Sequence, residues 1–290
     1  MKTKTIEKIL RGQFANFIKS IKDDKVRKLV IDNSIITGGS IVSLILEEKV
    51  NDYDIYFTNK ETVLAVANYY RDILIKDNPM LRSDCTIEED KDGRIRFFIR
   101  STGLITKQTK AKFYPSAITD NAISLTNDIQ LILRFYGPPE EIHKNYDFVH
   151  VKSYWLSKTG KLYLNPESLE AILAKELRYT GSLYPLASIF RLRKFLSRGW
   201  TISAGDIFKM AFQLRSYDLS NPQVLYDQLI GVDVHYFNMM IERIKSDIKS
   251  GKVSNISESY VSELVDEIFH QTDDYDLSRY LDTETKDEEE

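Results

Sequence analysis

The sequence predicts an α+β fold, with a mixed sheet and packed helices over residues 1–160, an all-helical domain over 161–275 and an acidic tail over 276–290. Short β-branched and alternating segments occupy much of the first half, interrupted by helical patterns. After Asn165-Pro166 the apolar patterns have the helical period. A length of 290 residues suits two ordinary domains. We expect the tail to be disordered, because acidic residues dominate it.

The first sixty residues predict a helix, a strand, a glycine turn, a short helix and an alternating strand. Apolar residues recur every three or four positions in the opening helix, and the first strand is the β-branched run SIIT. Ser40 is expected to cap the short helix, since a serine hydroxyl can accept a backbone N–H there. In order, these elements span residues 6–21, 34–37, 38–39, 41–48 and 52–57.

The segment from residue 61 to residue 155 predicts one helix followed by the strands of a mixed sheet. Asp92-Gly93 separates two strand-like runs and is a hairpin turn signal. Gly137-Pro138-Pro139 interrupts the pattern, a short helical turn follows, and FVHVKSYW then predicts a return to strand. The helix is expected at 61–76 and the strands at 85–89, 94–100, 111–118, 122–126, 129–135 and 148–155.

Six helices are predicted in the second half. Asn or Ser before a first turn, Pro near the first helical position and Gly251 after the fifth pattern are the boundary signals. The patterns span residues 166–179, 185–199, 204–216, 221–230, 234–251 and 258–271.

Composition narrows the class of protein. Hydrophobic residues make up 42% of the chain and charged residues 29%, which fits a globular protein, and no apolar run approaches the roughly 18 residues of a membrane span. The first residues lack the apolar core and cleavage site of a signal peptide, so we expect a cytoplasmic location. With one cysteine, Cys85, and four scattered histidines, the sequence offers no zinc ligand set, and a hard, oxygen-bound metal is the kind it favours.

The charge is unevenly distributed. The formal net charge is −3, but residues 282–290 hold six acids and one lysine, which leaves +2 for residues 1–281. A mildly basic body can hold a polyanion on one face, although the charge alone does not require it.

Two aspartates, Asp52 and Asp54, stand one residue apart at the start of an apolar strand. The strand period of two directs both carboxylates to the same face. Such a pair is either a solvated strand edge or a metal site, because adjacent like charges repel unless a cation lies between them.

Gly38, Gly39 and Ser40 change the balance between those two interpretations. A glycine turn ahead of a helix lets backbone N–H groups approach phosphate oxygens, and the helix N-terminus adds partial positive charge. Ser40 would then place its hydroxyl against the β- or γ-phosphate. A turn with a serine cap is the ordinary alternative, but the ordered combination of this turn, eleven intervening residues and Asp-x-Asp is uncommon by chance.

In these residues the sequence resembles the nucleotidyltransferase superfamily typified by DNA polymerase β, the poly(A) polymerases and the tRNA CCA-adding enzymes. The family pattern is Gly-Gly/Gly-Ser, a helix, Asp-x-Asp/Glu and a third carboxylate on a later strand. The resemblance implies that residues 1–160 form a nucleotidyltransferase head, that Asp52 and Asp54 bind two Mg²⁺ ions, with Mn²⁺ as a substitute, and that the glycine turn with Ser40 holds the triphosphate.

Asp147 is the residue we expect to be the third carboxylate, binding the catalytic metal and accepting the proton of the acceptor hydroxyl. It precedes the strand-like run FVHVKSYW. Its separation from Asp54 implies an inserted segment between them. Asp120 and Asp92 are alternatives, although both are also typical turn residues.

Two further motifs point to the CCA-adding and bacterial poly(A) polymerase branch. Asn121-Ala122 matches an Asn-Ala pair of that branch, without the arginine and aspartate that precede it there. YPLASIFRLRKFLSRGW resembles its Asp-Pro-Leu and arginine-rich helix, with Tyr184 in place of the aspartate. Arg191, Arg193 and Lys194 of this helix would bind the nucleotide, or the helix buries its apolar side and leaves its charges in water.

The predicted function is metal-dependent transfer of a nucleoside monophosphate from a nucleoside triphosphate to an acceptor hydroxyl, with release of pyrophosphate. We expect the acceptor to be a tRNA-like RNA 3′ end. Nucleotidylation of a protein or small molecule, and a catalytically silent nucleotide-binding module, are the alternatives. Expected partners are therefore a nucleoside triphosphate, ATP among them, and an RNA, with no membrane.

Overall fold

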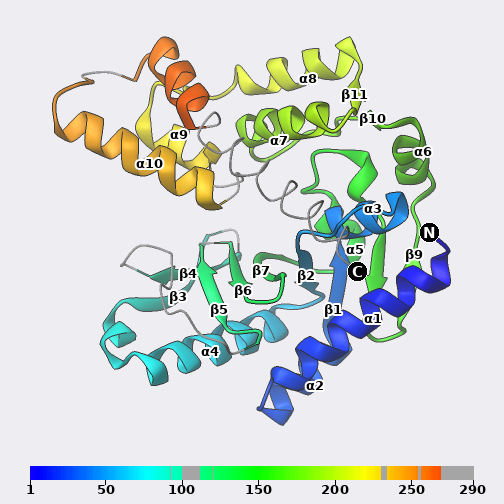
Figure 1. Ribbon diagram of the computed structural model, residues 1–290. Helices are drawn as coiled ribbons and strands as arrows, with labels where there is room; N and C mark the ends of the chain where they lie inside the picture. Colours follow the sequence, from blue (N-terminus) through cyan, green and yellow to red (C-terminus); the bar gives the residue numbers. More distant parts are fainter. Residues whose placement is uncertain (92, 100–111, 120, 230–233, 254–255, 269–290) are drawn as a thin grey trace, which may run out of the picture. The chain divides into compact units, whose positions relative to one another are not determined.

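The computed structural model describes residues 1–91, 93–99, 112–119, 121–229, 234–253 and 256–268 (Figure 1). The chain divides into two compact units, one of residues 1–182 with 195–209 and one of residues 183–194 with those from 210 onward. The mixed sheet with packed helices and the helical C-terminal region confirm the α+β class predicted from the sequence. The domain boundary near residue 160 stays a prediction, and the tail at 276–290 lies outside the described residues.

Helices and strands are mixed along the first two thirds of the chain, and helices dominate the last third. The elements are α1 (Thr3–Ser20), α2 (Asp24–Asn33), β1 (Ser34–Thr37), α3 (Gly39–Leu46), β2 (Tyr53–Phe57), α4 (Lys60–Asp77), η1 (Pro79–Ser83), β3 (Cys85–Glu89), β4 (Ile95–Ile99), β5 (Pro115–Ile118), β6 (Ala122–Leu125), β7 (Ile129–Tyr136), α5 (Pro139–His143), η2 (Val149–Val151), β8 (Tyr154–Leu156), β9 (Lys161–Tyr163), α6 (Pro166–Ala174), β10 (Glu176–Leu177), α7 (Pro185–Ser197), β11 (Thr201–Ile202), α8 (Ala204–Leu214), α9 (Pro222–Leu229) and α10 (Val234–Lys249). Residues 258–268 are also helical.

A seven-stranded sheet forms the centre of the first unit, in the order β5-β6-β7-β2-β1-β8-β9. Strands β2 and β7 run parallel, and the other neighbouring pairs of this sheet are antiparallel. β3 and β4 form a separate antiparallel hairpin, as the turn signal at Asp92-Gly93 predicts, although Asp92 itself lies outside the described residues.

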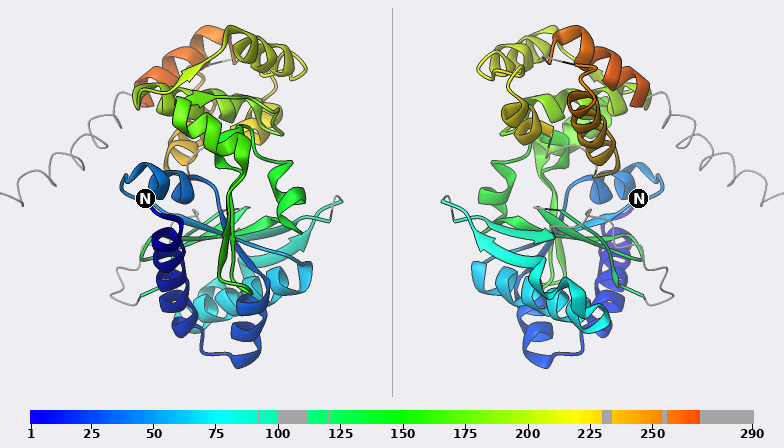
Figure 2. Two further views of the ribbon diagram at one scale, coloured as in Figure 1. Left: turned by 90° about the vertical axis from the view of Figure 1, so that its right-hand side faces the viewer. Right: turned by 90° about the vertical axis from the view of Figure 1, so that its left-hand side faces the viewer.

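The two faces of the seven-stranded sheet differ in chemistry. One face is apolar and packs against α1 and α4, whose buried residues include Leu10, Phe17, Val63 and Tyr70. The two views of Figure 2 show these helices on one side of the sheet. On the other face, a smaller cluster joins Ile142 of α5 to Tyr56 and Ile132. The lighter apolar cover there leaves room for polar side chains, among them Asp54 and Gln130.

The segment FVHVKSYW is a strand only in its last two residues, which corrects the expectation that Asp147 leads into one. Residues Val149–Val151 form a 3₁₀ turn, and the strand β8 begins at Tyr154. The backbone N–H of Val149 donates to Arg178 O at 3.0 Å, and the Ser168 hydroxyl donates to Val149 O at 2.6 Å. The first half of this segment therefore forms hydrogen bonds with residues between 165 and 180 and not with a neighbouring strand of the sheet.

The second unit is helical. Leu186 of α7, Leu225 and Leu229 of α9 and Met240 and Ile244 of α10 belong to one apolar core. The 3.6-residue period places these apolar residues on one side of each helix. The helices that this period predicts are present in the region. Among the described helices, none combines the length and the apolar character that crossing a membrane requires.

His150 is buried in an aromatic cage of the first unit. Its ring centroid lies 6.0 Å from that of Phe148, 4.7 Å from Phe195 and 4.6 Å from Trp200. Neither ring nitrogen has a hydrogen-bond partner among the described residues. Burial lowers the pKa of His150 to about 4, against the opposing charge of Asp147.

We predict that His150 makes the protein less stable as the pH falls from about 6.5 to about 4. The unfolded chain takes up the proton near pH 6.5 and the folded chain only near 4, so protonation favours the unfolded state across this window, by on the order of 3 kcal/mol in total. Urea unfolding of the wild type and of His150→Phe across this range measures the effect. Because His143 titrates in the same window, the variant should retain a shallower slope, and equal slopes would contradict the prediction.

Candidate nucleotide and metal site

Strand β2 carries the Asp-x-Asp pair at the middle of the seven-stranded sheet. Asp52 is exposed just before the strand, and Asp54 is half-buried within it. Burial, and then the neighbouring charge of Asp52, raise the pKa of Asp54 well above its usual range. A carboxylate whose ionisation is opposed by burial and by a neighbouring carboxylate is a place where a cation would be stabilising.

Gly38 joins the glycine turn to this pair. Its backbone has φ 94° and ψ −151°, which an L side chain rarely adopts, and it precedes the first turn of α3. A Cβ on Gly38 would lie 3.2 Å from Asp54 Oδ2 and 3.7 Å from the Tyr146 hydroxyl. The turn therefore approaches the carboxylate as closely as only a glycine allows.

The structure corrects the role expected for Ser40 at the helix end. Helix α3 begins at Gly39, its cap residue is Gly38, and no side chain caps it. Ser40 thus lies inside the first turn, where it is 3% exposed and its hydroxyl has no hydrogen-bond partner among the described residues. A buried hydroxyl without a partner is costly, and an anion at the helix end would supply an acceptor for it.

A polar network lies behind Asp54. The Thr37 hydroxyl donates to Ser153 O at 2.8 Å, so the 3.0 Å contact from His143 Nε2 must be a donation to Thr37 Oγ1. Burial lowers the pKa of His143 to about 4, with Lys152 acting in the same direction, which agrees with a neutral ring protonated on Nε2. His143 is therefore positioned as a structural donor, and it contacts Tyr146 at 5.1 Å between ring centroids.

Tyr146 connects this network to the carboxylate. Burial is the main reason that its pKa is raised, followed by the neighbouring Tyr56 and Asp54. Its ring centroid lies 6.0 Å from that of Tyr56. Tyr146 and Thr37 could not be assigned to the site from the sequence, because neither belongs to a motif and only the folded chain places them near Asp54.

Asp147 is 7% exposed and directly follows Tyr146 in the chain. Its backbone O accepts from Thr180 N at 2.8 Å, and its charge acts on His150 and Lys152. Among the described residues, no three His, Cys, Asp or Glu side chains gather in a group that could hold a metal ion. The alternatives Asp120 and Asp92 lie outside the described residues, and the role of Asp147 stays a prediction.

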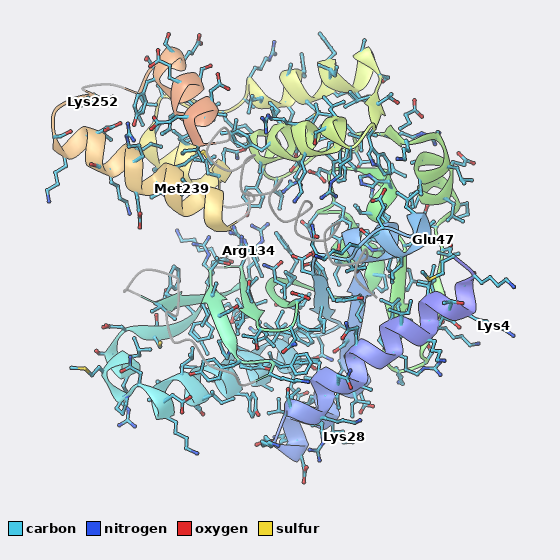
Figure 3. The ribbon with its side chains drawn as sticks, viewed as in Figure 1. Lys4, Lys28, Glu47, Arg134, Met239 and Lys252 are labelled. Atoms are coloured by element: carbon cyan, nitrogen blue, oxygen red, sulfur yellow. The ribbon has the colours of Figure 1, made fainter. Side chains whose placement is uncertain are left out.

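Arg191, Arg193 and Lys194 lie on the part of α7 that belongs to the second unit, and their nucleotide contacts also stay a prediction. Asn121, from the predicted Asn-Ala motif, has a defined partner in the first unit. Arg134 of β7, which is labelled in Figure 3, donates from Nη1 to Asn121 Oδ1 at 3.0 Å. Arg134 is 6% exposed, so this guanidinium fixes the turn before β6 from within the sheet.

Comparisons with known proteins give both a family and a set of similar structures. The chain matches the model of the Gabija anti-defense 2 family over residues 8–175. Gabija anti-defense 2 of Bacillus phage SPbetaL7 is 21% identical over 262 residues, which cover 87% of this chain and 56% of that protein.

The similar solved structures include CCA-adding enzymes, the branch named from the sequence. The Thermotoga maritima enzyme complexed with tRNA is 14% identical over 74% of this chain and 50% of that one, with a TM-score of 0.40. The Bacillus stearothermophilus enzyme in complex with CTP is 13% identical over 79% of this chain and 51% of that one, with a TM-score of 0.36. The chain spans about half the length of these relatives.

We predict that Gly38→Ala and Gly39→Ala have opposite effects on stability. A methyl group on Gly38 meets the Asp54 carboxylate in a strained backbone conformation, so the free energy of unfolding should fall by about 1–3 kcal/mol. Gly39 is helical with open space around its Cβ position, so alanine there should leave it unchanged or raise it by about 0.5 kcal/mol. Urea denaturation of both variants measures the difference. Similar losses in the two would show that the close approach at Gly38 is not a constraint.

Proposed function

The chain belongs to the Gabija anti-defense 2 family, and we propose that it is a metal-dependent nucleotidyltransferase. It would move a nucleoside monophosphate from a nucleoside triphosphate to an acceptor hydroxyl. The observation that carries the proposal is the contact of the glycine turn with the Asp-x-Asp pair, in which Gly38 lies against Asp54 Oδ2. The glycine turn would bind phosphates and the aspartates a cation, side by side.

The residues present fit a triphosphate with a divalent cation. The buried Ser40 hydroxyl lacks an acceptor, which a phosphate oxygen would provide, and the N–H groups of the first turn of α3 are further donors. Asp52 and Asp54 are the hard oxygen ligands that Mg²⁺ or Mn²⁺ prefers. Such an ion, when bound, would neutralise phosphate charge and polarise the α-phosphate.

The reaction itself is an in-line displacement. The acceptor oxygen forms a bond to the α-phosphorus, the bond from that phosphorus to the bridging oxygen breaks, and pyrophosphate leaves with the electron pair. The proton of the acceptor hydroxyl passes to a carboxylate, for which Asp147 remains our candidate. Glycine-turn contacts keep the triphosphate aligned while this occurs.

An RNA 3′ end is the acceptor that we test first. The mildly basic body and the cations of α7 support it, because arginine forks suit phosphate oxygens. The family name describes a role against the Gabija defense, and transfer onto an RNA or a protein that this defense uses would serve that role. A protein or small-molecule acceptor is therefore the alternative within the same chemistry.

A nucleotide-binding module without catalysis is the second candidate. The small number of metal ligands favours it. In the part of the chain that the structure describes, no three His, Cys, Asp or Glu side chains form a group that could hold a metal ion. Such a module would bind the triphosphate and release it unchanged.

Label transfer from α-labelled triphosphates tests the proposed reaction. We expect label in RNA when the wild type is incubated with magnesium, each triphosphate, total RNA and total protein. The Asp52→Ala/Asp54→Ala double variant should lose at least ~100-fold, since it lacks the groups that balance charge in the transition state. Asp72→Asn is the control, because Asp72 is an exposed residue of α4, on the opposite face of the sheet. Label in protein would mean that the acceptor is a protein. Retained activity in the double variant would mean that Asp52 and Asp54 are not the catalytic site.

Ser40→Ala separates a phosphate role from a structural role. Since the hydroxyl is buried without a partner, alanine should leave the free energy of unfolding unchanged or raise it by about 1 kcal/mol. If Ser40 contacts a phosphate, the affinity for the triphosphate should fall roughly tenfold. Ser43→Ala, one turn further along α3, is the matched control. Calorimetric titration and urea unfolding give both numbers, and unchanged affinity would remove Ser40 from the site.

A further inference from the structure

Gln130 is the residue of β7 that lies directly beside Asp54. The two strands are parallel, and their register pairs the Cα atoms of Asp54 and Gln130. Residues paired in this way lie on the same face of a sheet, with side chains close enough to share a ligand. Tyr53 and Ile129 form the preceding pair, on the apolar face, so the alternation places no other β7 residue as close to the carboxylate.

The amide of Gln130 has a defined orientation. Its Nε2 donates to the Ser124 hydroxyl at 3.3 Å, and Ser124 is its Cα partner on β6. The amide nitrogen is thus directed to the β6 side. The atom left for the β2 side is Oε1, a neutral oxygen.

The oxygen ligands at this position limit the number of metal ions. A two-ion clamp is built from carboxylates on neighbouring supports, and an ion in addition to the one that the triphosphate brings depends on those carboxylates. Here Asp52 and Asp54 are carboxylates, Gln130 is a neutral amide, and the described residues contain no group of three His, Cys, Asp or Glu side chains that could hold a metal ion. The described residues therefore do not fit the two-ion arrangement that the resemblance to nucleotidyltransferases implies.

We propose that the site binds a single divalent cation together with the triphosphate, and that Gln130 sets this number. The proposal rests on the proposed function, because it assumes that a triphosphate binds at the glycine turn. Asp52 and Asp54 hold the ion that the triphosphate brings. At the position of Gln130, a neutral amide stands where a third carboxylate could bind a second ion.

Counting Mn²⁺ tests the proposal without any turnover. The protein is dialysed to equilibrium with Mn²⁺ and a saturating triphosphate analogue whose α–β bridge is a methylene group, with ATP and CTP analogues run separately. Bound Mn²⁺ is counted per chain by electron paramagnetic resonance, after subtraction of the ion held by free analogue. We expect one Mn²⁺ per chain in the wild type and two in Gln130→Glu, which adds a carboxylate of the same length.

Each result has a distinct meaning. Two ions in the wild type would overturn the proposal and leave the proposed function in place, and Asp147→Asn and Asp120→Asn would then identify the extra ligand. One ion in Gln130→Glu, in a variant whose urea unfolding matches the wild type, would mean that Gln130 does not set the number. No bound analogue and no bound Mn²⁺ in the wild type would reject the proposed function, and this inference with it.

Discussion

The parallel pairing of β2 with β7 is the constraint on which the rest of the first unit depends. Parallel neighbours cannot be joined by a tight turn, so the chain between Phe57 and Ile129 must cross over the sheet. Helix α4 provides that crossover and covers the apolar face, while β5 and β6 extend the sheet beyond β7. Antiparallel β1 closes the other side of β2 and delivers the glycine turn. The Asp-x-Asp pair thus lies centrally, supported from both sides.

The candidate site depends on backbone that approaches a carboxylate without a side chain between them. Gly38 makes that approach possible, and the network of Tyr146, Thr37 and His143 fills the space behind Asp54. Thr37 is buried, His143 and Tyr146 are half-buried, and none of the three adds a negative charge beside the pair of aspartates.

Local rules were sufficient to predict the elements that carry the motifs. SIIT, the glycine turn and DYDIYF follow from composition and period within a few residues, and the helices after Asn165 follow from their apolar spacing. The segment around Asp147 could not be predicted in this way, because FVHV alternates like a strand while its hydrogen bonds go to Arg178 and Ser168. Gln130 was missed for a related reason. In IQLILRF it is one polar residue of a strand, and only the register of β7 against β2 gives it a neighbour.

An irregularity in that register lies just beyond the site. Tyr53, Asp54 and Ile55 pair with β7 in one continuous register, and this register shifts between Ile55 and Phe57. A slip of one residue would turn Asp54 into the apolar core and bring Ile55 to the polar face, so the in-step part is the part that cannot vary. A bulge absorbs changes in strand length and twist locally. Sequence changes after Ile55 in β2 can therefore be accommodated at this irregularity. The part of the strand that holds Asp54 can then keep one geometry while the rest of the strand changes.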